Sequence, residues 1–204
     1  MVHIRTVAGA LTHEGDKVRG SRFIADVAPA VSDAAALAFV QSVRDREPSA
    51  THHCWGFRLH DGRERGSDDG EPSGTAAGPI LRHLGGADLV DVALVVTRYY
   101  GGTKLGTGGL IRAYGWATAE ALRLVEVVLR PVVVALAVQH DYELSGPVDA
   151  VLAAFGTRVV SAEYGAAVSL VVEVGVEVSS AFTAQVIEAT SGRVVPVAVP
   201  GVVA

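Results

Sequence analysis

A glycine-rich block in the middle of the chain has the residue types of an anion-binding loop. Five glycines fall within nine residues of the run Arg98-Tyr99-Tyr100-Gly101-Gly102-Thr103-Lys104-Leu105-Gly106-Thr107-Gly108-Gly109-Leu110. Glycine lets the backbone approach a ligand with its N–H groups turned inward, and the N-terminus of a following helix adds unpaired donors. The candidate ligand-binding residues are Arg98, Tyr99, Tyr100, Gly101, Gly102, Lys104, Gly106, Thr107, Gly108 and Gly109. The alternative is a tight strand-to-helix connection that serves only the fold.

An acidic block lies upstream, in the run Ser67-Asp68-Asp69-Gly70-Glu71-Pro72-Ser73-Gly74-Thr75. Three carboxylates within four residues could bind Mg²⁺ or transfer protons. They could instead cap a helix that starts near Thr75, where negative charge is favourable. Asp68, Asp69 and Glu71 are therefore candidate catalytic residues, with helix capping as the alternative.

Two histidines and the single cysteine stand together in Thr51-His52-His53-Cys54-Trp55. On a strand, His52 and Cys54 share one face, while His53 and Trp55 share the other. His52 and His53 are candidate catalytic residues, and a Cys54 nucleophile with a histidine base is conceivable. A zinc site would need further nitrogen or sulfur donors, which the chain offers only at distant positions, so no metal site and no cofactor are expected. The alternative is a half-buried strand with hydrogen-bonded imidazoles.

Charge and aromatic residues limit where a nucleic acid could bind. The net charge is −5; residues 1–130 carry 15 basic and 15 acidic side chains, and residues 131–204 carry 2 and 7. A protein that coats a duplex normally has a basic excess, so a nucleic-acid contact must be local and lie in the first part. Tyr99, Tyr100, Tyr114 and Trp116 cluster around the glycine-rich block. Stacking on bases is one use of such residues, and packing of a helix on a sheet is another.

The elements that must position these blocks follow from periodicity and turn signals. Strands are predicted at 2–10 and 17–28, joined by the turn Glu14-Gly15-Asp16, and at 51–59 and 89–97. Helices are predicted after the cap Ser32-Asp33, at 75–84 and at 110–129. Residues 60–73 have the composition of a loop. The first 130 residues are thus expected to form one α/β domain.

A second domain is predicted from Pro131 onward. The residue before a proline is biased away from the helical region, and a β-branched run starts at Val132. The expected elements are strands at 132–139, 157–163, 167–176 and 194–199, and helices at 144–155 and from the cap Ser179-Ser180 to Thr190. This βαββαβ order is the ferredoxin-like arrangement. The predicted domains are therefore residues 1–130 and 131–204.

Several protein classes are excluded by composition and by the ends of the sequence. The longest apolar runs fall short of the roughly 20 residues that a membrane-spanning helix needs, and the first residues do not have the pattern of a signal peptide. A single cysteine excludes an intrachain disulfide. A cytoplasmic protein without a membrane partner is the expectation, and the oligomeric state is left open.

Taken together, four blocks resemble the IMPACT family in its bacterial YigZ-like branch. They are Ser21-Arg22-Phe23-Ile24, His52-His53-Cys54-Trp55, the acidic block and the glycine-rich block, and the resemblance covers essentially the whole chain. One departure is visible: the lysine usual before Ser-Arg-Phe is Gly20 here, with Arg19 one position earlier. The resemblance implies an N-terminal α/β domain with a left-handed βαβ crossover, shared with some ribosomal proteins and the GHMP kinases. It also implies a C-terminal ferredoxin-like domain similar to the last domain of elongation factor G.

The resemblance implies a link to translation, because nucleic-acid or ribosome-linked binding is suggested for the bacterial branch and the eukaryotic relatives act in translational control. The first hypothesis is a regulatory or binding protein that contacts RNA, the ribosome or a translation-associated protein through the glycine-rich face. The second is an enzyme acting on a phosphorylated small molecule or nucleotide, with the glycine-rich loop as the anion site. A third is a purely structural role, in which the motifs maintain the fold and Gly106, Gly108 and Gly109 are required for backbone conformation; Gly108→Ala should then cost stability if the φ of Gly108 is positive.

Overall fold

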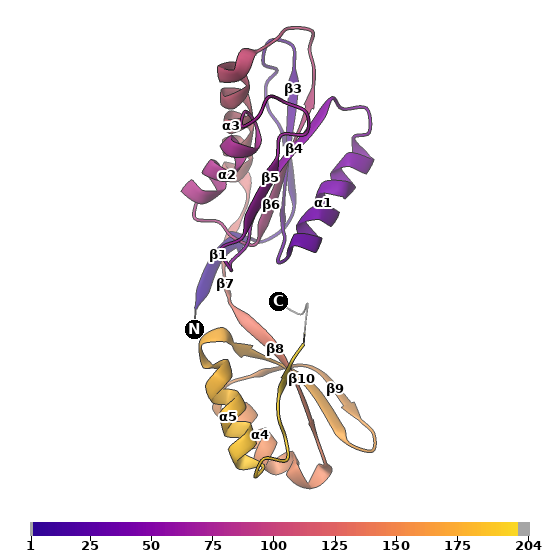
Figure 1. Ribbon diagram of the computed structural model, residues 1–204, viewed down its shortest axis with the longest axis vertical. Helices are drawn as coiled ribbons and strands as arrows, with labels where there is room; N and C mark the ends of the chain where they lie inside the picture. Colours follow the sequence, from indigo (N-terminus) through magenta and orange to yellow (C-terminus); the bar gives the residue numbers. More distant parts are fainter. Residues whose placement is uncertain (1, 200–204) are drawn as a thin grey trace. The chain divides into compact units, whose positions relative to one another are not determined.

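The computed structural model describes residues 2–199, and the chain divides into two compact units. One unit comprises Ile4–Arg130, and the second contains residues 131–199 together with residues 2 and 3. The mixed α+β fold expected from the sequence is confirmed (Figure 1). No helix among residues 2–199 is long and apolar enough to cross a membrane.

A five-stranded sheet forms the centre of the first unit. Its strand order is β2-β3-β6-β4-β5, with the bounds β2 Leu11–Glu14, β3 Arg22–Pro29, β6 Val92–Tyr99, β4 His52–Arg58 and β5 Glu64–Ser67. Every neighbouring pair in this sheet is antiparallel. Because β3 and β4 both pair antiparallel with β6, they run parallel to each other, and the connection between them through α1 (Asp33–Arg46) is a βαβ crossover. The left-handedness expected for this crossover stays a prediction.

Helices cover both faces of this sheet (Figure 1). Helix α1 packs on one face, where Val40 and Val43 meet Trp55 and Phe57. Helices α2 (Ala77–Gly86) and α3 (Gly106–Leu124) pack on the other face. The central strand β6 is buried on both faces, as its continuous apolar sequence predicts. The predicted cap of α1 is also confirmed, because the Ser32 side chain accepts a hydrogen bond from the Ala35 N–H at 3.1 Å.

Three sequence predictions in this unit are wrong in part. The helix expected at 110–129 begins at Gly106 and ends at Leu124, and the next residues form strand β7 (Val127–Pro131). Strand β7 pairs with β1 (His3–Val7) in a separate two-stranded sheet, so the partner of β3 is β2 and not the segment 2–10. The expected loop at 60–73 contains the edge strand β5. The β-branched residues of β7 favour a strand, but its strand partner β1 is distant in the sequence. Local periodicity does not reveal this pairing.

The second unit has the βαββαβ order expected from the sequence. Its sheet order is β11-β8-β10-β9, with the bounds β11 Val197–Ala198, β8 Val133–His140, β10 Val168–Gly175 and β9 Arg158–Tyr164. Helices α4 (Ser145–Ala154) and α5 (Ser179–Ala189) pack on one face of this sheet, where Val148, Phe182 and Val186 are fully buried. Short 3₁₀ turns, Tyr142–Leu144 and Val176–Val178, lead into both helices. The expected caps at Ser179 and Ser180 are absent, because the residue before the helix is Val178 and no side chain caps this end.

Candidate functional site

The glycine-rich loop opens onto a pocket of about 350 Å³ at the start of α3. We call this the Lys104 pocket; it is lined by Glu71, Pro72, Arg98, Tyr100, Lys104, Leu105, Gly106, Thr107 and Leu110. Strand β6 delivers Arg98 at its end, and the acidic loop supplies Glu71 and Pro72. The glycine-rich loop supplies Tyr100, Lys104 and Leu105, and the first turns of α3 supply Gly106, Thr107 and Leu110. Five of the ten predicted ligand-binding residues therefore line one pocket, together with one predicted catalytic residue, Glu71.

The N-terminus of α3 is an unsatisfied donor site at the edge of this pocket. The residue before the helix is Leu105, so no side chain caps the first N–H groups, and the first turn holds no acidic residue. Gly106 has a φ of +72°, a conformation that glycine adopts without strain. Lys104 is exposed and forms no ion pair within residues 2–199. The positive end of the helix and an unpaired ammonium group therefore border the same space.

A buried ion pair forms the floor of the Lys104 pocket. Arg98 Nη1 donates to Glu71 Oε1 at 2.6 Å, and the two side chains are only 5% and 4% exposed. Tyr114 donates its hydroxyl hydrogen to the same Glu71 oxygen at 2.8 Å. Glu71 is thus held by two donors from β6 and α3, which fixes its position and satisfies its charge.

The guanidinium of Arg98 is further fixed by its neighbours. Arg98 Nη2 donates to Ser21 Oγ at 3.2 Å, and the Gly101 N–H donates to the same hydroxyl at 3.2 Å. The guanidinium lies 5.4 Å from the ring centre of Tyr100. Its Nε is buried and has no acceptor within residues 2–199. The sequence alone indicates Ser21 only as a strand residue, and its position in the Ser-Arg-Phe block is the one signal of this role.

Asp68 has the capping role that the sequence left open. Its Oδ1 accepts the N–H groups of Ala76 and Ala77 at 2.9 Å each, and its Oδ2 accepts the Gly74 N–H at 2.8 Å. Burial alone would raise the pKa of Asp68, but these backbone donors outweigh burial and hold the pKa below its usual value. The carboxylate therefore organises the start of α2, and it does not line the Lys104 pocket.

Asp69 joins the acidic loop to the sheet and to α1. It accepts the His53 N–H at 2.6 Å and Arg44 Nη2 at 2.7 Å, and its φ of +45° is a left-handed conformation. Like Asp68, it is absent from the lining of the Lys104 pocket.

Among residues 2–199, no group of three or more His, Cys, Asp or Glu residues is arranged to hold a metal ion.

The two predicted faces of the strand at His52 are confirmed, and they separate the two histidines. His52 lies on the Cys54 side, with its Nε2 3.9 Å from Glu71 Oε1 and its Nδ1 2.8 Å from the Asp69 carbonyl oxygen. His53 lies on the α1 side, where its Nε2 is 3.1 Å from the Glu47 carbonyl oxygen. His52 is therefore adjacent to the floor of the Lys104 pocket, whereas His53 is not.

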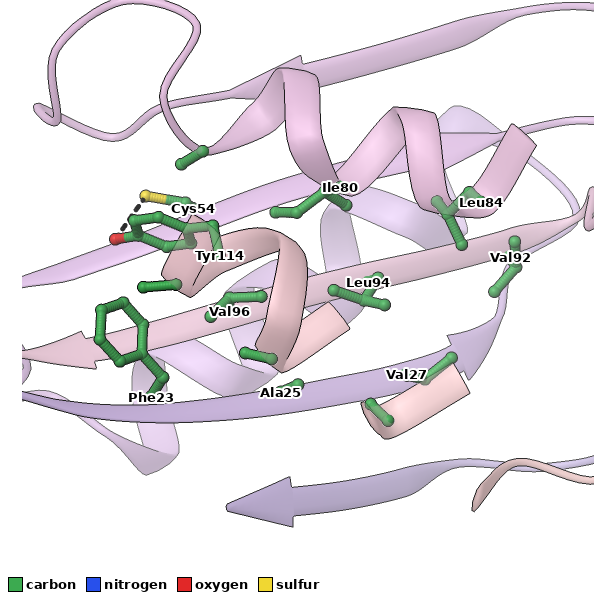
Figure 2. Packing of buried hydrophobic residues seen from close by; sticks show 14 of the residues in the cluster. Phe23, Ala25, Val27, Cys54, Ile80, Leu84, Val92, Leu94, Val96 and Tyr114 are labelled. Atoms are coloured by element: carbon green, nitrogen blue, oxygen red, sulfur yellow. Dashed lines mark hydrogen bonds between the residues drawn. The ribbon is translucent and has the colours of Figure 1, made fainter. Parts of the chain in front are cut away.

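Cys54 is a buried core thiol next to Tyr114. Figure 2 shows the two side chains meeting between β4 and α3, with Cys54 Sγ 3.3 Å from the Tyr114 hydroxyl. Burial raises the pKa of Cys54 from 9.0 to about 12, although the hydrogen bond with Tyr114 acts in the opposite direction. Burial also raises the pKa of Tyr114 above its usual value. A fully buried, protonated thiol lacks the thiolate that nucleophilic attack requires.

The remaining predicted ligand residues divide between packing and open space. The Tyr99 hydroxyl donates to Glu47 at 2.6 Å and lies outside the pocket lining. A Cβ at Gly101 would clash with backbone atoms, and Gly102 has a φ of +84°. Gly108 is an ordinary helical residue without a positive φ, and a Cβ there would meet only Arg112 Nη1, at 3.6 Å. The fold therefore gives no conformational reason for glycine at position 108.

Comparisons with known proteins agree with this architecture. The family model of the Impact N-terminal domain matches residues 19–122. The family model of a domain of unknown function, DUF1949, matches residues 138–193. The first match includes the acidic and glycine-rich blocks, and the second covers most of the βαββαβ unit.

Individual relatives extend these matches over most of the chain. "IMPACT family member YigZ" from Escherichia coli (strain K12) is 35% identical over 181 residues, which is 87% of this chain and 89% of the relative. "IMPACT family member YvyE" from Bacillus subtilis (strain 168) is 35% identical over 190 residues, 92% of this chain and 87% of the relative. A solved structure titled "Crystal structure of an hypothetical protein" is 32% identical with a TM-score of 0.72, covering 98% of this chain and 99% of that chain. The similarity therefore includes both compact units.

Proposed function

This chain belongs to the IMPACT family, and from that premise we propose that it is a translation-linked binding protein that holds RNA backbone phosphate in the Lys104 pocket. Membership of this family suggests a regulatory or translation-linked role. The pocket has the hydrogen-bond donors that a phosphate oxygen needs. The proposal concerns binding, and it assigns no reaction to the pocket.

The convergence of positive groups on one pocket carries this proposal. The uncapped N-terminus of α3, the unpaired Lys104 ammonium and the buried Arg98 guanidinium all border the same space. The one carboxylate in the lining, Glu71, already accepts hydrogen bonds from Arg98 and Tyr114. Phosphate groups are the anions that proteins commonly bind at helix N-termini with an added basic side chain.

The acidic groups nearby favour binding over catalysis. Asp68 is fully engaged in capping α2, and Asp69 pairs with Arg44 and a backbone N–H. Cys54 is buried and protonated at neutral pH. Asp68, Asp69 and Cys54 thus have structural partners, whereas the Lys104 ammonium and the first N–H groups of α3 have no side-chain partner within residues 2–199.

The test is equilibrium binding of a fluorescently labelled single-stranded RNA, followed by anisotropy. We expect Lys104→Ala to weaken binding, because each phosphate contact contributes a salt-dependent share of the affinity. Arg82→Ala is the matched control, since Arg82 is an exposed cation on α2 that lies outside the pocket lining. Both variants remove one positive charge, so a difference between them reports position and not net charge.

Each outcome of this binding test either supports or contradicts the proposal. Weaker binding by Lys104→Ala alone supports the proposal. Equal binding by both variants contradicts it. If the wild-type protein binds no RNA at low salt but is stabilised against heat by a nucleotide or a phosphorylated metabolite, the proposal is wrong and the enzyme hypothesis replaces it.

A further inference from the structure

A second pocket lies beside the first, against a neighbouring face of the first turns of α3. We call it the Trp116 pocket; its volume is about 230 Å³, and it is lined by Val18, Arg19, Leu105, Gly109, Arg112, Ala113 and Trp116. Residues 105, 109, 112, 113 and 116 follow the spacing of one helix face, and Leu105 belongs to both pockets. The two pockets are therefore neighbours along the surface of one unit.

A tight turn supplies the other wall of the Trp116 pocket. Val18 and Ser21 exchange two backbone hydrogen bonds of 2.9 and 3.0 Å, and the residues between them, Arg19 and Gly20, have φ values of +47° and +84°. Two positive φ values define a turn of the I′ type, in which a non-glycine residue at the first central position is strained. The turn places an arginine where glycine or asparagine would be less strained. Such an outlier is a reason to look for a function at that residue.

Two basic residues line the Trp116 pocket. Arg19 and Arg112 are exposed, and neither forms an ion pair within residues 2–199. By contrast, the neighbouring Arg22 pairs with Glu14 at 2.7 Å. Together with Lys104, these two arginines make a local excess of positive charge around the start of α3, in a unit that is neutral as a whole.

The indole of Trp116 adds an aromatic surface to the pocket that Arg19 and Arg112 line. Its residue is 38% exposed, whereas the other tryptophan, Trp55, is only 8% exposed. The six-membered ring lies so close to Gly15 that a Cβ there would come within 2.5 Å of it. The ring is therefore seated on backbone and borders an open pocket flanked by guanidinium groups, which is the combination that binds unpaired bases.

We propose that the Trp116 pocket holds a base of single-stranded RNA by stacking on Trp116, with Arg19 and Arg112 contacting the adjoining phosphates. This inference rests on the proposed function, because it places the neighbouring phosphate of the same strand in the Lys104 pocket. A base inside a duplex has no free face to stack on a side chain, so the ligand must be single-stranded here.

The test combines a change in the RNA with a change in the protein. A short oligoadenylate and an abasic ribose-phosphate chain of the same length are titrated into the wild-type protein and the Trp116→Leu variant. Replacing an aromatic residue that stacks on a base typically lowers the affinity by roughly 5- to 100-fold. We expect that loss for Trp116→Leu with the oligoadenylate, and equal affinities of the two proteins for the abasic chain.

Tryptophan fluorescence gives an independent readout. Oligoadenylate is expected to change the emission of the wild-type protein and to leave the emission of Trp116→Leu unchanged, because Trp55 is buried on the α1 side of the sheet. Trp116→Tyr is the rescue variant and should bind within a few-fold of wild type. Should Trp116→Leu fail to fold, Arg112→Ala at the exposed rim tests the same pocket and should weaken binding of both oligomers.

The outcomes distinguish failure of the stacking inference from failure of the proposed RNA-binding function. If RNA binding depends on Lys104 but the affinity for oligoadenylate is the same with and without Trp116, the stacking inference alone is wrong. If the wild-type protein binds neither oligomer, both proposals are overturned. If binding depends on Trp116 but not on Lys104, the base subsite stands and the assignment of the phosphate to the Lys104 pocket falls.

Discussion

Gly20 and Gly101 are in backbone contact: a Cβ built on Gly101 would lie 2.0 Å from the Gly20 carbonyl carbon and 2.3 Å from the Ser21 nitrogen. This contact joins the Val18–Ser21 turn to the glycine-rich loop. It explains why the position before Ser21 is glycine, since Gly20 combines a φ of +84° with a neighbour that leaves no room for a side chain. Arg19, one position before Gly20, lines the Trp116 pocket.

The first prediction follows from this contact. Gly101→Ala must push the turn and the loop apart, because backbone atoms at 2.0–2.3 Å cannot give way as a flexible side chain can. We expect a loss of about 1–3 kcal/mol in the free energy of unfolding, the usual range for overpacking. Urea denaturation measures it, and an unchanged midpoint would show that the contact is looser than described.

Gly108 gives the opposite expectation. A Cβ at this helical position meets only Arg112 Nη1 at 3.6 Å, so Gly108→Ala should leave stability unchanged or raise it by up to about 1 kcal/mol. If a phosphate approaches the first turn of α3 closely, the same substitution should weaken RNA binding. Loss of stability would instead favour the purely structural role for the glycines, and retained stability with unchanged binding would remove Gly108 from the site.

Arg98 and Lys104 should differ sharply in their effect on stability. Arg98→Ala leaves Glu71 buried and without its cation, and breaking such a pair costs about 3–5 kcal/mol. Lys104 is exposed and unpaired within residues 2–199, so Lys104→Ala should change the free energy of unfolding by less than about 0.5 kcal/mol. Chemical denaturation of the two variants compares them directly. Similar losses would contradict the placement of Arg98 in the floor of the pocket.

Stability should fall at alkaline pH because of the buried Cys54–Tyr114 pair. Burial raises the pKa of Cys54 from 9.0 to about 12, so above about pH 9 the unfolded state releases a proton that the folded state retains. The contribution of the Cys54 thiol to the free energy of unfolding is fully present below pH 9 and is lost as the pH rises toward 12. The raised pKa of Tyr114 lowers the stability at alkaline pH in the same way.

The Cys54→Ala variant isolates the contribution of the thiol. It should show a shallower decline of the free energy of unfolding between pH 8 and pH 11 than the wild-type protein. Parallel curves for the two proteins would mean that the thiol titrates alike in the folded and unfolded states. Urea denaturation over a pH series provides the data.

The sequence predicts most elements of the fold because their signals are local. The β-branched run after Pro131 and the apolar segment at 89–97 reappear as β8 and β6. The errors lie where a distant partner decides the structure. Val127 and Val128 follow a helix and become a strand only because β1, from the start of the chain, pairs with them. The charged strand β5 is likewise defined by its pairing with β4 and not by its composition.

The sequence predicts which residue types belong to the candidate site, but it does not predict which of these residues line the pocket and which stabilise the fold. Composition marks Asp68, Asp69 and Glu71 alike, yet only Glu71 reaches the Lys104 pocket, because the loop turns through Asp69 and Gly70 at positive φ. Of the residues that line the Trp116 pocket, the sequence marks Gly109 and Trp116 as candidates but does not place them in a second pocket. Arg19 joins it across 97 positions of sequence through a turn whose conformation is not evident from residue types, so no local pattern pairs the two.

The most direct test of the account is the salt dependence of single-stranded RNA binding with and without Lys104. The slope of log Kd against log salt should be smaller for Lys104→Ala by about 0.7, the value for one phosphate contact on a single strand. The slope for Arg82→Ala should equal that of the wild-type protein. A slope that Lys104→Ala leaves unchanged would contradict the central claim that this pocket holds an RNA phosphate.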